Sequence, residues 1–139
     1  MKRLSPLGLL LVVAFSFSCK KLIQQQEEKA IMNIITNGNW YVYQYLQGSG
    51  DITTNFSGYL FKFNTNGTVL GTKNGISDTG TWSPNVDART ITSTFPSAGP
   101  PVSLLNGVWK INDSGADFVR ASFNDTVNHY LNTLQLRKQ

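Results

Sequence analysis

The chain has 139 residues, the length of one domain, with 12 basic and 8 acidic residues and a formal net charge of +4 at pH 7. A single histidine and a single cysteine argue against a transition-metal centre, which draws several ligands from these residue types. The basic residues form no stripe or Arg-rich helix, so we expect no nucleic-acid partner. The composition therefore favours one small domain without a metal or other cofactor.

The first eighteen residues have the pattern of a secretory leader. Two basic residues near the start precede an apolar run over residues 7–17. That run is shorter than the about 20 residues that a membrane-spanning helix requires. Ser18, directly before Cys19, is a small residue of the kind found at cleavage sites. We therefore predict that residues 1–18 are a signal peptide that is removed.

The junction before Cys19 resembles a bacterial lipobox, in which a small residue precedes a cysteine that becomes lipid-modified. Ser16 stands where such boxes usually carry an aliphatic residue, and the alternative is an ordinary signal peptide with an incidental cysteine. Because a lone thiol is a liability in an oxidising compartment, acylation also explains the single cysteine. The resemblance implies a lipoprotein of the cell envelope, expected at the outer membrane, with acyl chains such as palmitate on Cys19.

Residues 19–37 are predicted to form a lipidated tether and a short helix. Alanine and isoleucine residues recur at helical spacing between positions 30 and 35. Glutamates before them favour the positive end of a helix, and the Asn-Gly pair at 37–38 is a natural C-terminal stop. We expect the isoleucine face of this helix to cover one end of the domain.

From residue 39 onwards the apolar periodicity changes to two, which indicates β-strands. The first strand, residues 40–46, is rich in strand-forming residues. Simple alternation predicts that Trp40, Val42 and Leu46 share one face. The opposite face then carries Tyr41, Tyr43 and Tyr45. If this tyrosine stripe is exposed, it offers a platform for sugar rings.

Turn signals divide the rest of the chain into further short strands. The clearest hairpin turn is the Asn-Gly turn within residues 64–67, and a second Asn-Gly pair follows at 74–75. The proline-rich stretch 96–101 is predicted to be a loop, because proline lacks the donor that a central strand needs. About eight strands spaced in this way predict an all-β fold, a small antiparallel up-and-down β-barrel preceded by the short N-terminal helix.

Several short motifs resemble lipocalins in their order and spacing. Gly38-Asn39-Trp40 is similar to the Gly-x-Trp opening of that family. The stretches that resemble the lipocalin-like domains of Gram-negative lipoproteins are 56–63, 66–69, 80–82, 104–111 and 134–136. The resemblance implies a lipocalin-like barrel domain over residues 38–139. It also implies a late arginine packed over Trp40, for which Arg137 is the first candidate and Arg120 the second.

Six aromatic residues are the candidates for contact with a small apolar ligand in such a barrel. They are Trp40, Tyr59, Phe61, Phe63, Trp82 and Trp109. Apolar walls with a few polar groups make a binding site, but large aromatic side chains are also typical of a packed core. If the core is solid, loops such as 48–55 and 96–106 would instead contact a protein or a glycan.

Reactive residues are few, and we expect no enzyme activity. His129 follows Asp125 by four residues, but no nucleophile elbow accompanies it. Asp125-Thr126-Val127 resembles a three-residue O-glycosylation site of exported Gram-negative proteins, with Thr126 as the acceptor, and a plain turn is the alternative. The sequence thus predicts a membrane-anchored lipoprotein that binds a small hydrophobic or amphipathic ligand, or else a protein- or glycan-interaction module of the envelope.

Overall fold

The computed structural model describes the backbone of residues 6–139 and the side chains of residues 21–139. It begins with one helix, α1 (Pro6–Thr36), which leads into an antiparallel sheet. The strands are β1 (Trp40–Gln47), β2 (Gly50–Asp51), β3 (Leu60–Phe63), β4 (Thr68–Lys73), β5 (Ile76–Asn85), β6 (Thr90–Thr94), β7 (Gly107–Ser114), β8 (Phe118–Asp125) and β9 (Tyr130–Lys138). Two 3₁₀ turns are η1 (Thr53–Phe56) and η2 (Val102–Leu105).

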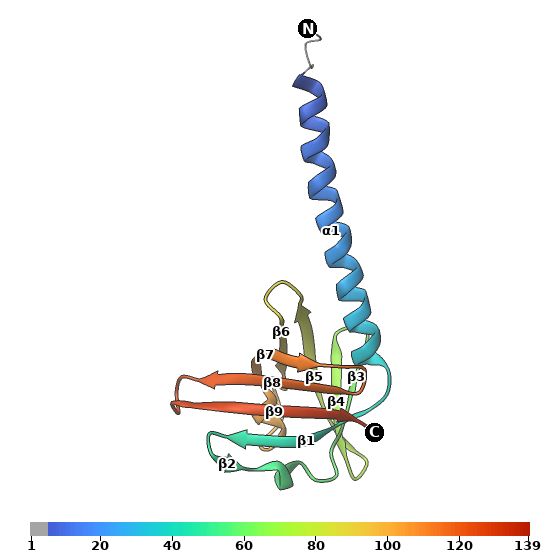
Figure 1. Cartoon of the computed structure of the whole chain (residues 1–139). Coiled ribbons are helices and arrows are strands. Elements are labelled where there is room, and N and C mark those ends of the chain that lie inside the picture. Colours follow the sequence, from blue (N-terminus) through green and yellow to red (C-terminus); the bar gives the residue numbers. More distant parts are fainter. Residues whose placement is uncertain (1–5) are drawn as a thin grey trace.

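The sheet closes on itself because β1 pairs with β9 along its whole length, from Trp40 opposite Lys138 to Gln47 opposite Asn132 (Figure 1). From β3 onwards each strand pairs with the next one in sequence, and the two-residue β2 only extends the end of β1. The result is a closed, eight-stranded, antiparallel up-and-down barrel. The predicted fold class is confirmed, and the β1–β9 pairing covers edges that an open sheet would expose.

The seam between β1 and β3 is the weakest part of the closure. These strands share one residue pair, Trp40 opposite Phe61. Further along the seam, the amide of Ile52 donates to the carbonyl of Tyr45 at 3.0 Å, and the Tyr45 amide donates to the Thr53 hydroxyl at 2.9 Å. The segment that contains η1 thus supplies the backbone partners that a neighbouring strand would otherwise provide.

Both predicted Asn-Gly turns are present. Asn74 and Gly75 have φ values of 53° and 76°, the pair of positive values that a two-residue hairpin turn requires between Lys73 and Ile76. The earlier turn, between β3 and β4, has Gly67 at φ 85°. Asn74, Gly75 and Gly67 adopt the positive φ values that tight turns require, and these turns therefore set the register of both hairpins.

A β-bulge in β1 changes which tyrosines face inward. Val42 lies opposite Leu136 but Gln44 lies opposite Gln135, so Tyr43 is the extra residue. The alternation shifts by one position after it: Tyr43 is 46% exposed and Tyr45 is 1% exposed. The prediction of a three-tyrosine face, with Leu46 beside Trp40 on the other, is therefore wrong.

Helix α1 is fixed to the barrel at its C-terminal end, from which it extends beside the β5–β6 hairpin (Figure 1). Ile35 is buried in the core, with Ile31 packed partly against it, so the predicted covering role of the isoleucine face is confirmed. The indole nitrogen of Trp40 donates to the Ile35 carbonyl at 2.9 Å, and Lys62 Nζ donates to the Thr36 carbonyl at 2.6 Å. These bonds satisfy carbonyls that the helix end leaves open.

Candidate functional site at the barrel mouth

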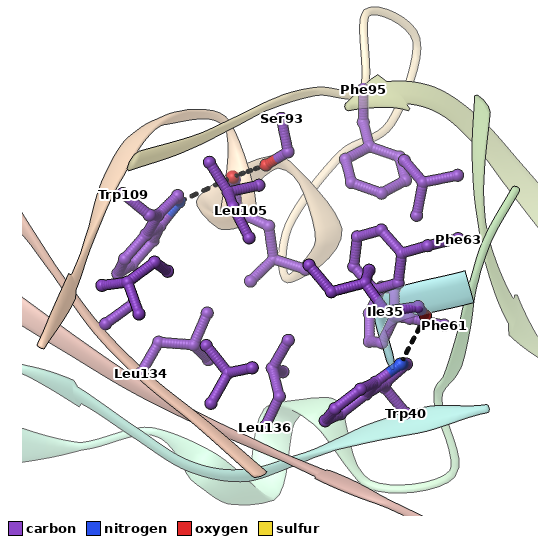
Figure 2. A pocket seen from close by; sticks show the side chains of 15 residues that line it. Ile35, Trp40, Phe61, Phe63, Ser93, Phe95, Leu105, Trp109, Leu134 and Leu136 are labelled. Carbon is purple, nitrogen blue, oxygen red and sulfur yellow. Dashed lines mark hydrogen bonds between the residues drawn. The ribbon is translucent and has the colours of Figure 1, made fainter. Parts of the chain in front are cut away.

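The barrel interior is nearly full. It holds a cavity of about 60 Å³, whose walls are aliphatic and aromatic apart from Ser93 (Figure 2). The Ser93 hydroxyl donates to the carbonyl of Leu105, which also accepts a hydrogen bond of 2.9 Å from the indole nitrogen of Trp109. Because these polar groups bind one another, the cavity wall has no polar side chain left to orient a ligand.

The six aromatic candidates fall into two groups. Those that line the cavity are Trp40, Phe61, Phe63 and Trp109. Tyr59 stacks on Phe61 with ring centres 6.1 Å apart, and Trp82 meets the edge of Phe63 at 5.4 Å. All six belong to the core cluster or pack against it. They fill the lumen instead of surrounding an open space.

A glycine shows how closely this core is packed. A Cβ atom at Gly71, on β4, would lie 2.9 Å from Cε1 of Phe61 on the neighbouring strand. That is nearer than real Cβ atoms approach carbon, so the Phe61 ring occupies the space that a larger residue would need. Small residues beside large rings therefore leave the lumen far below the roughly 300–1,000 Å³ of small-molecule sites.

A larger groove lies at the mouth of the barrel, between α1 and the ends of β5, β6, β7 and β8. Its volume is about 670 Å³. Ile31 and Ile34 line it from the helix, and Val86 and Arg89 line it from the β5–β6 turn. In size the groove falls within the range of small-molecule sites.

Four apolar side chains form the boundary between the groove and the interior cavity. Ile35, Ile91, Ile111 and Val119 line both spaces. Ile35 is 6% exposed, and Figure 2 places it among the lining side chains of the cavity. The last turn of α1 thus closes the lumen and at the same time provides the floor of the groove.

Charged and polar groups stand at the rim of the groove. Gln24 donates a hydrogen bond of 2.7 Å to Asp87, which ties α1 to the β5–β6 turn. Glu27, Arg89 and Asp113 line the groove itself. Sequence reasoning missed Glu27 and Arg89 because they lie 62 positions apart and line the same groove only through the packing of the helix on the barrel.

The opposite end of the barrel is closed by Tyr45. Its hydroxyl donates to the carbonyl of Leu104 at 2.9 Å, and its ring stacks on Phe56 with centres 5.3 Å apart. Burial raises the pKa of Tyr45 to about 12, with further contributions from the nearby charges of Tyr130 and Asp125. The phenol is therefore a neutral structural donor at ordinary pH.

A lysine takes the place over Trp40 that was predicted for an arginine. Lys138 Nζ lies 5.2 Å from the centre of a Trp40 ring. Arg137 instead lies 3.6 Å from the centre of the Tyr43 ring, and Arg120 lies 5.5 Å from that of Phe118. Both arginine candidates were wrong because Lys138 is the residue opposite Trp40 in the β1–β9 register. The inward alternation of residues 134 and 136 is the signal that would have identified position 138.

The predicted modification site lies on the β8–β9 turn, and Thr126 is exposed there. Asp125 accepts hydrogen bonds from the amides of Val127 at 3.0 Å and Asn128 at 2.9 Å. Hydrogen bonds from the Asn128 side chain and backbone lower the pKa of Asp125. His129 is exposed on the same turn with φ 60°. These contacts build a turn, and glycosylation of Thr126 stays a prediction.

The leader and the Cys19 side chain lie outside the residues whose side chains are described. Backbone geometry continues α1 across positions 18 and 19, so the helix is longer than the segment predicted from the sequence. In the described part of the chain, no helix is both long and apolar enough to cross a membrane. Within the same part, no three His, Cys, Asp or Glu side chains gather as metal ligands.

Comparison with known proteins supports the fold. A scan against models of protein families finds no match, and a search of curated proteins finds none either. Among solved structures, the chain is similar to a DUF4847 family protein from Bacteroides vulgatus ATCC 8482, a crystal structure at 1.00 Å resolution. The TM-score is 0.53 and the identity 16%, over 78% of this chain and 99% of that chain. At this identity the likeness concerns the fold alone, a small antiparallel barrel with which a lipocalin-like domain agrees.

Proposed function

We propose that the chain is a lipoprotein, held at an envelope membrane through Cys19, that binds a small hydrophobic or amphipathic ligand without catalysis. The ligand site is the groove at the barrel mouth. The observation that carries this proposal is the groove itself, about 670 Å³ with an isoleucine floor and a charged rim. The full lumen, with about 60 Å³ of free space, offers no comparable site.

The anchor and the groove fit together geometrically. From Cys19 to Thr36 the helix rises about 26 Å, at 1.5 Å per residue. Figure 1 shows α1 leaving the barrel at its mouth. The groove is lined by this helix and therefore lies on the side of the domain that faces the tether. With Cys19 acylated, the groove would face the membrane from which amphiphiles could enter it.

Native mass spectrometry of the full chain, purified from membranes, tests the site. We expect a co-purified amphiphile on the wild type, and its loss in the variant Ile34→Asp, because Ile34 lines the groove and is 36% exposed. The matched control is Ile76→Asp, at the other end of β5, where the side chain is 74% exposed. A wild type that carries no ligand, or equal occupancy in both variants, would contradict the proposal.

Acylation of Cys19, the proposed anchor, is tested separately from ligand binding. Mass spectrometry of the mature N-terminus should show acyl chains on Cys19, and Cys19→Ala should move the protein from the membrane fraction to the soluble fraction. Two or more chains hold a protein stably at a membrane, whereas one chain does so only marginally. An unmodified thiol on the mature protein would remove the anchor from the proposal without affecting the groove.

A second function is favoured by one specific observation, the filled lumen. A barrel with a solid core is a scaffold, and its loops would then contact a protein or a glycan. Loops 48–55 and 96–106 are the surfaces for that role. Exposed Tyr43, stacked by Arg137, is what remains of the predicted tyrosine platform. Loss of partner capture on changing these loops, together with an empty groove, would favour this function.

A further inference from the structure

Glu27 faces the groove because of its place on α1. Gln24, Glu27, Ile31 and Ile34 follow one another at intervals of three and four, which puts them on one side of a helix. Gln24 on this side is hydrogen-bonded to Asp87 of the β5–β6 turn. The Glu27 carboxylate therefore lies between a fixed contact and the isoleucines of the groove floor.

Arg89 is held on the opposite wall by its own backbone. Its amide donates to the carbonyl of Val86 at 3.2 Å, and its carbonyl accepts from the amide of Ile111 at 2.8 Å. Asn85 also closes this turn, because its side chain accepts a hydrogen bond of 3.0 Å from the Ala88 amide. These bonds fix the backbone of the turn, from which the exposed Arg89 side chain extends along the wall of the groove.

The two charges do not neutralise each other. Across the described side chains, 21–139, the one ion pair within 4.0 Å joins Arg120 to Asp113 at 3.5 Å. Asp113 thus already has a cation, whereas Glu27 and Arg89 line the same groove without forming such a pair. The groove therefore offers one separate negative and one separate positive group above an apolar floor.

This pattern discriminates among ligands. A purely apolar molecule would cover the floor but leave both charges without a partner. A singly charged amphiphile would meet one attractive group and one repulsive group. A zwitterionic headgroup satisfies both. No aromatic side chain among the described residues lines the groove, so the aromatic cage that suits quaternary ammonium groups is missing. A primary ammonium, which donates hydrogen bonds to a carboxylate, fits better.

We infer that the groove takes a zwitterionic phospholipid with a primary-amine headgroup, drawn from the membrane that anchors the chain. Its phosphate contacts Arg89, its ammonium contacts Glu27, and part of its acyl chain covers Ile31, Ile34 and Ile91. This inference rests on the proposed function, since it names the ligand of the same groove. Bidentate contact between guanidinium and phosphate is the geometry that arginine offers and lysine does not.

Competition among lipids tests the inference. The full chain, purified in a nonionic detergent, is incubated with an equimolar mixture of phosphatidylethanolamine, phosphatidylcholine, phosphatidylglycerol and diacylglycerol, and native mass spectrometry measures the adducts. We expect the phosphatidylethanolamine adduct to be about tenfold more abundant than each of the other adducts, which is the preference that one charge-assisted hydrogen bond would provide. Glu27→Gln should raise phosphatidylglycerol to the level of phosphatidylethanolamine, and Arg89→Gln should lower both relative to diacylglycerol. Glu28→Gln, a change on the helix that does not line the groove, should leave the pattern as it is.

The outcomes separate the headgroup from the site. Equal adducts of all four lipids, unchanged in Glu27→Gln and Arg89→Gln, would overturn the inference and leave the proposed function standing. A preference for phosphatidylglycerol that Glu27→Gln does not alter would also overturn it. No adduct of any of the four lipids would overturn the inference, and a wild type that also carries no co-purified amphiphile would overturn the proposed function with it. Circular dichroism of each variant confirms that the barrel is intact.

Discussion

The lumen and the mouth groove share four side chains, yet they are opposite kinds of space. Below Ile35, aromatic rings fill the barrel until about 60 Å³ remains, and the polar groups there bind one another. Above Ile35, the groove measures about 670 Å³ and is lined by Glu27 and Arg89, neither of which forms an ion pair within 4.0 Å among the described side chains. An eight-stranded barrel is just wide enough for side chains to fill it. The larger space arises here because a helix stands beside the rim of the barrel, and the barrel interior does not supply it.

The largest test of this contrast compares one residue from each region. Phe61→Ala should lower the free energy of unfolding by about 3–5 kcal/mol, since it empties a buried aromatic site. Ile34→Ala should cost under about 1 kcal/mol, because the side chain is already 36% exposed, but it should weaken ligand binding. Urea unfolding gives both stabilities. Equal losses of unfolding free energy in the two variants would contradict the distinction between a packed core and an open groove.

The closed end of the lumen provides a test of intermediate size. Tyr45→Phe removes the donor to the Leu104 carbonyl and should lower the free energy of unfolding by about 1–2 kcal/mol. Ligand binding should not change, because Tyr45 does not line the groove. Denaturant titration of the variant beside Tyr43→Phe, an exposed control, measures the effect. Equal stabilities for the two variants would mean that the hydroxyl is not a structural donor.

The same tyrosine predicts a pH dependence. Its pKa is about 12 in the folded protein, against about 10 for an exposed tyrosine in the unfolded chain. The folded state holds the proton more tightly, so this contribution to stability is complete below pH 10 and is lost as pH rises from 10 to 12. Unfolding free energies measured across this window should fall more steeply for the wild type than for Tyr45→Phe. Parallel curves would contradict the assignment.

The smallest expected effect comes from filling the lumen cavity. Ala121 lines the lumen cavity, and Ala121→Val adds two methyl groups to a space of about 60 Å³. We expect a gain of about 0.5–1 kcal/mol in the free energy of unfolding, the usual return of cavity filling. Lipid adducts should stay as in the wild type. If Ala121→Val displaced the ligand, the lumen and not the groove would be the binding site.

Local sequence chemistry was sufficient to predict most of the fold. Period-two alternation, Asn-Gly turns and the proline-rich loop identified an eight-stranded barrel, and the spacing of the isoleucines identified the helix that covers its mouth. Each of these signals acts within a few residues, which is why a single sequence carries them. The six aromatic candidates lie in the core or pack against it, whereas the sequence did not distinguish residues that line a ligand site from residues that fill a core.

What the sequence left open depends on contacts between distant segments. The bulge at Tyr43 turns Tyr45 inward because β1 must match the register of β9, and the same register puts Lys138 over Trp40. Cavity size follows from how rings on several strands interlock, which alternation does not specify. Glu27 and Arg89 face one groove only after α1 packs on the rim. By itself, the sequence determined a small antiparallel β-barrel with a helix over its mouth, whereas the lipoprotein leader stays a prediction. Tertiary structure alone decided that the lumen is nearly full and that the larger groove lies outside it, between α1 and the rim.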